Sequence, residues 1–215
     1  MKHLKLFESF KDIKSICKKY GIENYTINPD GSVDVDGNVD LSFSHLFDFP
    51  VVGGLQLTKL PLKFGRVSGS FLCDGNKLTT LEGSPSYIGR DFSCKNNKLT
   101  TLEGGPREVG FSFFCQHNQL TTLKGSPEIV GGDFYCRYNQ LTTLEGAPRE
   151  VRFEFSFRDN PVYQIYELFK KRKVFMDSLD WGYIRGNKIV KSRFEEACAE
   201  AGIKMPESIK GYEYI

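Results

Sequence analysis

The feature that most constrains this chain is an asparagine that recurs every 21 residues. The five copies are Asn76, Asn97, Asn118, Asn139 and Asn160, with no insertion between them. Neighbouring positions keep the same interval, so the unit reads F-x-C-x-x-N-x-L-T-T-L-x-G-x-P-x-x-[VI]-x-x-x. One unit is too short to bury its apolar side alone, whereas stacked units share a continuous core. The repeat therefore predicts an elongated stack of similar coils.

The segment that begins each unit has the two-residue period of a β-strand. In F-x-C the phenylalanine and the cysteine lie on one face, so we expect a strand of about three residues in each unit. Glycine and proline interrupt the rest, which must bring the chain back to start the next strand beside the last. We therefore predict an α/β repeat protein whose short parallel strands lie about 4.8 Å apart, with a mostly irregular opposite side.

The unit resembles the leucine-rich repeat, whose pattern is L-x-x-L-x-L-x-x-N-x-L-x-x-L. Asn139 takes the asparagine of that pattern, and Phe134, Cys136, Leu141 and Leu144 take four of its apolar positions. Val130, one residue before the first leucine position, is assigned to that position. The short period and the following proline are similar to the short bacterial class found in secreted effectors. The strand phenylalanine and the step G-G-D-F-x-C are similar to repeat proteins of tailed bacteriophages. The clear repeats cover residues 67–160, under half of the chain. The resemblance implies a solenoid that binds partners on its concave strand face.

The flanking segments have the features of caps on the open ends of a solenoid. Residues 1–45 are predicted to form an amphipathic helix that ends at Gly21, followed by a hairpin signalled by the turns NPDG and DGN. Residues 46–160 are the predicted leucine-rich-repeat solenoid. Residues 161–215 are predicted to form an α/β cap, with helices from Pro161 and from about Ser192 to Ala201, a hairpin between them and an irregular tail.

Upstream of residue 67 two spacings compete. Leu57, Leu60 and Val67 keep the interval of 21 residues. A different interval, of 16 residues, relates the pairs Val39/Leu41, Leu55/Leu57 and Phe71/Cys73. We interpret this segment as two shortened coils whose register the sequence leaves open.

Cysteine forms a column at Cys73, Cys94, Cys115 and Cys136. No C-x-x-C spacing or histidine column accompanies it, which argues against zinc. Side chains in register would leave Cβ atoms about 4.8 Å apart, against about 3.8 Å in a disulfide. The same position holds Leu57 in the preceding coil and Phe157 in the following one, so we interpret these thiols as core packing. Likewise, we interpret the asparagines as a structural ladder that satisfies buried backbone groups.

The bulk properties exclude several classes of protein. The 215 residues carry a formal net charge of +2, which gives no strong field for nucleic acid or an anionic membrane. Charges run through the first fourteen residues, and no apolar run reaches the length of a membrane span. We therefore expect a cytoplasmic protein with six reduced thiols, or one in the host-cell cytoplasm if the bacteriophage resemblance holds.

The sequence contains no pattern of residues that carries chemistry. His3, His45 and His117 are isolated, and no catalytic triad, phosphate-binding loop or metal-ligand spacing is present. We predict no catalytic residue, no metal and no cofactor. A basic run at Lys170–Lys173, together with exposed rings, would suit single-stranded nucleic acid. Acidic residues beside those rings would repel phosphates, so nucleic-acid binding is the weaker alternative.

The strand positions that the core leaves free form the candidate site. The middle column is Leu72, Ser93, Phe114, Tyr135 and Ser156, flanked on one side by Ser70, Asp91, Ser112, Asp133 and Glu154 and on the other by Asp74, Lys95, Gln116, Arg137 and Arg158. Exposed aromatic side chains beside arginine are typical of protein-binding hot spots. We expect Phe114, Tyr135 and Arg137 to be anchors, surrounded by Lys95, Gln116, Asp133 and Arg158. The alternative is that the rings only pair with each other across strands.

These observations predict a non-catalytic scaffold that binds a partner protein. The resemblance implies an accessory protein of a bacteriophage that acts on a host or defence factor. A structural component of a particle remains an alternative, and self-association through the ends of the sheets stays open.

Overall fold

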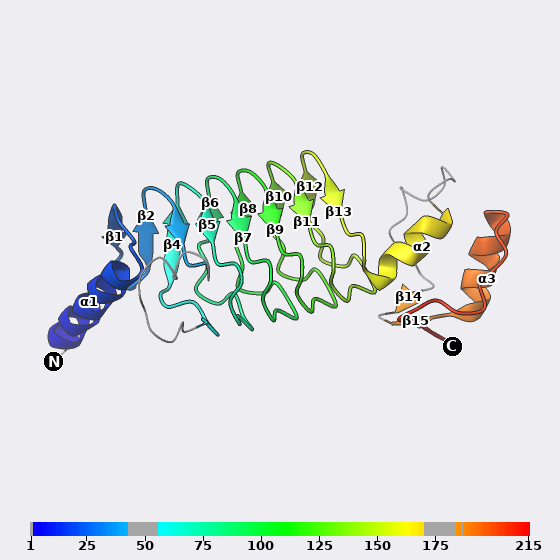
Figure 1. Cartoon of the computed structure of the whole chain (residues 1–215), viewed down its shortest axis with the longest axis horizontal. Coiled ribbons are helices and arrows are strands. Elements are labelled where there is room, and N and C mark those ends of the chain that lie inside the picture. Colours follow the sequence, from blue (N-terminus) through cyan, green and yellow to red (C-terminus); the bar gives the residue numbers. More distant parts are fainter. Residues whose placement is uncertain (1, 43–55, 170–183, 186) are drawn as a thin grey trace.

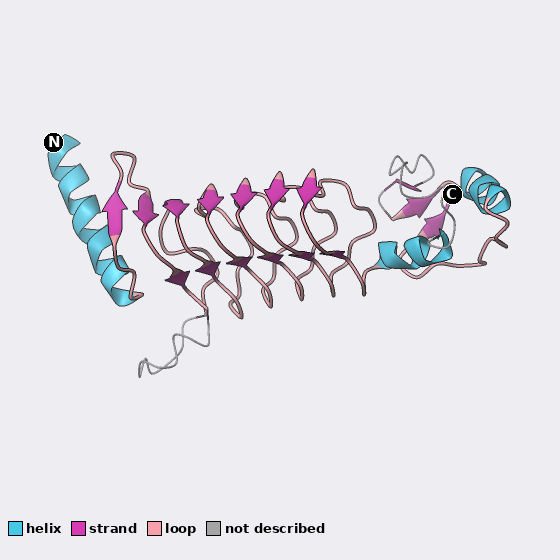
Figure 2. Cartoon of the chain, turned by 90° about the horizontal axis from the view of Figure 1, so that it is seen from above, coloured by secondary structure: helices cyan, strands magenta, loops and turns pink. Residues whose placement is uncertain are grey.

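The computed structural model describes residues 2–42, 56–169, 184–185 and 187–215. It is an α/β fold with few helices, in which most strands are parallel and lie in two stacked sheets (Figures 1 and 2). The seven-stranded sheet contains, in order, β1 (Tyr25–Ile27), β2 (Val33–Val35), β4 (Phe64–Val67), β6 (Tyr87–Ile88), β8 (Glu108–Val109), β10 (Ile129–Val130) and β12 (Glu150–Val151). The six-stranded sheet contains β13 (Phe155–Ser156), β11 (Phe134–Tyr135), β9 (Phe113–Phe114), β7 (Phe92–Ser93), β5 (Phe71–Leu72) and β3 (Val39–Asp40).

Each coil, meaning the chain from one repeated asparagine to the next, contributes one strand to each sheet. The phenylalanine position pairs in register, as in Phe113 with Phe134, and so does the β-branched position, as in Val109 with Val130. The expectation of a single sheet with a mostly irregular opposite side is therefore wrong. The column of valine and isoleucine was the available signal, because β-branched residues favour strands.

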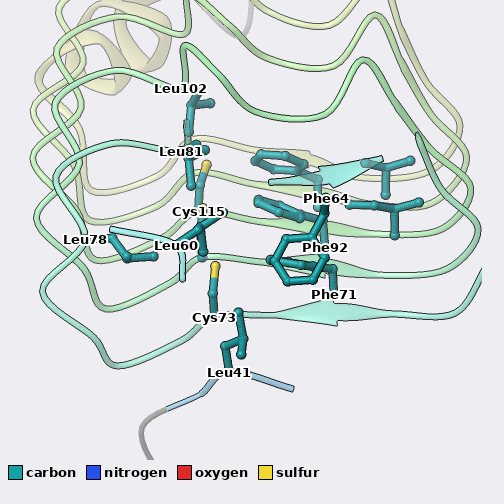
Figure 3. Packing of buried hydrophobic residues seen from close by; sticks show 14 of the residues in the cluster. Leu41, Leu60, Phe64, Phe71, Cys73, Leu78, Leu81, Phe92, Leu102 and Cys115 are labelled. Carbon is teal, nitrogen blue, oxygen red and sulfur yellow. The ribbon is translucent and has the colours of Figure 1, made fainter. Parts of the chain in front are cut away.

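The core between the sheets is built from identical positions of successive coils. Phe71, Phe92, Phe113 and Phe134 are fully buried, and their neighbouring ring centroids lie 5.9, 4.9 and 5.1 Å apart. Leucines close the other side of the core, and Figure 3 shows this packing. Each apolar position of the repeat thus forms a continuous column through the stack, and these columns hold the coils together.

The cysteine column is part of this core, as predicted. All four thiols are free and buried, and that of Cys73 donates to the carbonyl of Ser93 in the next coil at 3.2 Å. The predicted place of Leu57 in this column is wrong. The amide of Leu57 donates to the Asn76 side chain, as the amide of Leu78 donates to that of Asn97, so Leu57 matches Leu78.

The upstream member of the cysteine column is Leu41. Its amide donates to the carbonyl of Leu72, as that of Cys73 donates to Ser93, and Figure 3 shows Leu41 below Cys73 and Cys115. Leu41 and Phe157 bracket the column, so the conclusion that this position accepts any apolar side chain is unchanged.

The two shortened coils expected upstream are not formed. Strand β3 pairs directly with β5, with Val39 opposite Phe71, so a single interval of 32 residues separates these strands. Leu55 and His45 lie outside the described residues. The NPDG turn joins β1 and β2 as an antiparallel hairpin, as predicted. The DGN turn instead leads from β2 in one sheet to β3 in the other. Both sheets therefore extend upstream of residue 46, where we had expected them to begin.

The asparagine ladder, defined as the five repeated asparagines, is confirmed as a structural device. The Asn118 amide nitrogen donates to the carbonyls of Cys94 (3.0 Å) and Cys115 (3.1 Å), and its oxygen accepts the amide of Leu99 (3.0 Å). Asn97, Asn139 and Asn160 repeat this pattern. Each asparagine thus joins two coils at the point where the strand ends.

A row of glycines lets the coils approach each other beside the seven-stranded sheet. A Cβ atom on Gly110 would lie 2.3 Å from the carbonyl oxygen of Gly89, and one on Gly131 would lie 2.2 Å from that of Gly110. The obstacle is backbone, so it cannot swing away as a side chain would.

Gly110→Ala is expected to lower the free energy of unfolding by about 3 kcal/mol, because the coils must separate to admit the methyl group. Urea denaturation followed by circular dichroism measures this. Arg152→Ala is the control, since the last coil already carries a Cβ at this position, and we expect a change within about 0.5 kcal/mol. Equal effects of the two substitutions would contradict the close approach.

The caps agree with the predicted elements in most respects. Helix α1 (Lys2–Lys19) buries Ile13 and Cys17, while the side chain of Phe10 lies outside the described part. Helix α2 (Pro161–Phe169) follows the last ladder asparagine, and α3 (Lys191–Glu200) buries Phe194 and Cys198. Strands β14 (Ile184–Arg185) and β15 (Lys188–Ile189) form a hairpin. The tail is not irregular throughout, because β16 (Glu213–Tyr214) pairs with β15. None of the helices within the described ranges is long and apolar enough to cross a membrane.

Candidate binding surface

The outer face of the six-stranded sheet carries the predicted anchors. Phe114 and Tyr135 lie opposite each other on β9 and β11, are partly buried, and stack with centroids 5.6 Å apart and planes 8° apart. Their small neighbours Ser93 and Ser156 are almost fully buried. The two rings are thus the largest side chains in the middle column and are held in one arrangement by each other.

Arg137 is fixed beside these rings by three interactions. Its guanidinium donates to the Ser156 hydroxyl at 2.6 Å and to a Glu154 carboxylate oxygen at 3.0 Å. The guanidinium carbon lies 5.0 Å from the centroid of the Tyr135 ring. The Tyr135 hydroxyl donates to the second carboxylate oxygen of Glu154 at 3.1 Å. Tyr135, Arg137, Glu154 and Ser156 therefore form one network, in which a long side chain has lost most of its freedom.

The charges of this network shift two pKa values in opposite directions. Burial raises the pKa of Tyr135, and its hydrogen bond to the Glu154 carboxylate adds to the rise. Hydrogen bonds from Ser156, Tyr135 and Arg137 lower the pKa of Glu154. At neutral pH the phenol is therefore protonated and the carboxylate ionised, which is the pairing that the network needs.

The column that contains Arg137 also contains Asp74, Lys95, Gln116 and Arg158. These residues lie on the same face of the sheet and have different partners. Lys95 lies 3.6 Å from Asp74, which also accepts a hydrogen bond from the Ser93 hydroxyl. The side-chain oxygen of Gln116 is buried without a hydrogen-bond partner among the described residues. Arg158 is exposed and has no carboxylate partner within the described ranges. The structure thus brings Gln116 and Arg137 together beside the rings and leaves Lys95 and Arg158 at the two ends.

The other flanking column, which contains Asp91 and Asp133, mostly holds neighbouring coils together by hydrogen bonds. The sequence did not predict this role. An oxygen of Asp133 accepts the backbone amide of Glu154 at 2.9 Å, and the amide of Asp133 donates to the Ser112 hydroxyl at 3.1 Å. Asp91 accepts the amide of Ser112 in the same way. From Ser70 to Asp133 this position carries a short side chain that ends in oxygen, because each one accepts the amide of the next coil. This explains the alternation of serine and aspartate. Asp133, which we expected beside the anchors, therefore serves mainly to link its coil to the two neighbouring coils.

A second ring stack extends the surface at the residue before each ladder asparagine. These residues take a left-handed backbone, with φ of 56° at His117 and 53° at Tyr138. Both side chains are exposed, and their ring centroids lie 4.5 Å apart with planes 8° apart. The prediction that His117 is isolated is therefore wrong. In the sequence, only the interval of 21 residues connects it with Tyr138. The sequence signal was that His117 and Tyr138 directly follow Gln116 and Arg137, which belong to one column of the candidate site.

Nothing in the described ranges suggests a metal centre, because they contain no cluster of three or more histidine, cysteine, aspartate or glutamate side chains that could hold an ion. The basic run at residues 170–173 lies outside the described residues. The surface offers aromatic rings, one fixed guanidinium and hydrogen-bonding groups, which suits recognition by contact. No protein-family model, curated protein or solved structure matches this chain.

Proposed function

We propose that this chain is a solenoid of the leucine-rich-repeat type that binds a partner protein on the outer face of its six-stranded sheet. The observation that carries the proposal is the stacked pair Phe114–Tyr135, partly exposed and locked to Arg137. Aromatic and arginine side chains dominate the binding energy of protein interfaces. The second parallel sheet departs from the family pattern, so the assignment rests on the repeat unit and the asparagine ladder.

Preorganisation of the anchors supports this proposal. A side chain that is fixed before binding loses little conformational entropy on association, where a free one costs about 0.5–1.5 kcal/mol. Tyr135 and Arg137 are each held by hydrogen bonds to Glu154, and Phe114 is held by the Tyr135 ring. A partner would therefore meet an arrangement that is already formed.

The test compares two double variants with the same residue types. Tyr135→Ala/Arg137→Ala removes two of the three anchors and keeps Phe114. Arg66→Ala/Tyr87→Ala removes a matched pair from the seven-stranded sheet, where the Arg66 guanidinium carbon lies 4.1 Å from the Tyr87 ring centroid. We expect one stoichiometric partner to co-purify from the host lysate with the wild type and with the second variant, and to be lost with the first.

Equal retention by both variants would move the site away from this sheet face. Salt dependence separates the alternative of single-stranded nucleic acid, because phosphate contacts make binding fall steeply with ionic strength. If the captured species is nucleic acid and its binding falls steeply between 50 and 200 mM salt, the protein-scaffold proposal is overturned. The further proposal of a bacteriophage accessory protein acting on a host factor rests on the resemblance alone.

A further inference from the structure

Two successive coils of the stack are each joined to the next by a pair of hydrogen-bond donors at the second leucine of the repeat. In the coil before the last, the Thr122 hydroxyl and the Leu123 amide both donate to the carbonyl oxygen of Glu145, at 3.1 and 3.0 Å. One coil earlier, the equivalent threonine and leucine bind the carbonyl of Lys124 in the same way. This pair of donors therefore recognises one peptide carbonyl of the neighbouring coil.

The same pair in the last coil has no acceptor among the described residues. It consists of the Thr143 hydroxyl and the Leu144 amide, and we call it the donor pair. The Thr143 oxygen accepts the amide of Glu145 at 3.1 Å, but no described group accepts a hydrogen bond from either donor. Leu144 is also partly exposed, whereas the equivalent Leu102 and Leu123 are fully buried. The last coil thus keeps both the polar and the apolar half of a coil-to-coil contact.

The C-terminal cap replaces only part of a following coil. The amide of Val162, on α2, donates to the carbonyl of Leu141 at 2.9 Å, and the Tyr212 hydroxyl donates to the carbonyl of Thr142. Figure 1 shows α2 continuing directly from the last coil. The described cap residues therefore satisfy carbonyls of the last coil, but they offer no oxygen to its donor pair.

Thr143 lines a cavity of about 620 Å³ between the last two coils and the cap. Pockets that bind small molecules and short peptide segments have volumes of about 300–1,000 Å³. The two charged groups among the described lining residues, Lys124 and Glu145, pair with each other at 3.1 Å. The other lining residues that the proposal uses are neutral: Gln140, Thr142, Pro161, Asn187 and Gly211. The cavity therefore favours a neutral ligand that forms hydrogen bonds.

We propose that this cavity binds a neutral, extended segment of a partner protein. One backbone carbonyl of the segment accepts both hydrogen bonds of the donor pair, and an apolar side chain covers Leu144. A peptide carbonyl is the acceptor that the equivalent pairs bind in the two preceding coils. A carboxylate would instead be repelled by the nearby Glu145. No residue of the sheet face lines the cavity among the described residues, so this inference does not depend on the proposed function.

A titration of the full-length, ¹⁵N-labelled chain tests the proposal. The probe is the peptide acetyl-Thr-Leu-Gln-Gly-amide, which copies residues 143–146 with glutamine in place of the glutamate. We expect a dissociation constant of about 1 mM or more, with the largest change of chemical shift at the Leu144 amide, because that group gains a hydrogen bond. A peptide with serine in place of leucine is expected to bind about fivefold more weakly or less, since it leaves Leu144 uncovered.

Two matched protein variants separate the donor pair from general effects of threonine. Thr143→Val removes one donor and keeps the shape of the side chain, so we expect binding to weaken about fivefold. Thr80→Val is the control, because the Thr80 oxygen accepts the amide of Glu82 as that of Thr143 accepts the amide of Glu145. Thr80 does not line the cavity, so its variant should bind the peptide as the wild type does.

Four results would each overturn the proposal. The first is that the Leu144 amide does not shift at about 20 mM peptide. The second is equal binding of the serine peptide, and the third is an equal effect of Thr143→Val and Thr80→Val. The fourth is that sodium acetate at the same concentration shifts the Leu144 amide as strongly, which would identify a carboxylate site instead.

Discussion

Replacing Asn118 with alanine is expected to lower the free energy of unfolding by about 3–5 kcal/mol, because three buried hydrogen bonds are lost and one buried amide is left without a partner. That amide belongs to Leu99, whereas the carbonyls of Cys94 and Cys115 each keep a second ladder asparagine, Asn97 and Asn139 respectively. A buried polar group without a partner costs about 1–3 kcal/mol. Asn118 lies in the middle of the stack, so no cap residue replaces it. Urea denaturation followed by circular dichroism measures the loss.

Gln119→Ala is the matched control, since it shortens the adjacent, exposed amide side chain. We expect a change within about 0.5 kcal/mol. Asn118→Leu separates hydrogen bonding from packing, because it fills the volume and restores none of the three bonds. A loss in Asn118→Leu much smaller than that in Asn118→Ala would mean that packing, rather than the ladder, sets the stability at this position.

The free energy of unfolding is expected to fall steeply with pH above about pH 9. Burial raises the pKa of Cys73, Cys94, Cys115 and Cys136 above the ordinary value, so the folded chain keeps these protons where the unfolded chain loses them. The unfolded state then binds fewer protons, and stability decreases as pH rises. Each thiol contributes about 1.4 kcal/mol per pH unit, and the four together about 5 kcal/mol per unit. Below about pH 8 this contribution is fully present.

Denaturation midpoints in a reducing buffer between about pH 8.5 and 10 test this, because tyrosines begin to ionise above that range. Cys115→Val should remove one thiol's share of the slope, and Cys94→Val/Cys115→Val two shares. The stepwise decrease of the pH slope from wild type to single to double variant is the internal control. A general effect of alkaline pH would give the same slope in all three proteins. An identical slope in all three proteins would contradict the buried, protonated column.

The sequence predicted those features that depend on a side chain repeating without change. Asn76 to Asn160 and Phe71 to Phe134 keep their interval, so stacking, register and burial followed from the spacing. The second sheet was missed because its strands β6, β8, β10 and β12 are only two residues long and a single column of valine or isoleucine carries the signal. Leu57 was misplaced because two intervals competed, and only the hydrogen bond to Asn76 decides between them.

The candidate site was predictable in position but not in detail. Phe114, Tyr135 and Arg137 lie where the strand pattern placed them. The stack of His117 on Tyr138 depends on the left-handed turn before each asparagine, and the commitment of Asp133 depends on its hydrogen bond to the amide of Glu154. Spacing alone reveals neither.

The asparagine ladder has a consequence for how such a chain changes its length. Within the described residues, the side-chain amide nitrogen of each ladder asparagine donates to its own coil and to the one before it, so a duplication or deletion of one whole unit preserves the pattern of these bonds. Such a change alters the stability only by the contribution of one coil and its interfaces, but it also alters the surface available for recognition. Loss of the unit that carries Tyr135 and Arg137 would remove two of the proposed anchors and leave the other coils stacked. Gain or loss of whole units during evolution would therefore change the binding surface while the remaining coils keep their fold.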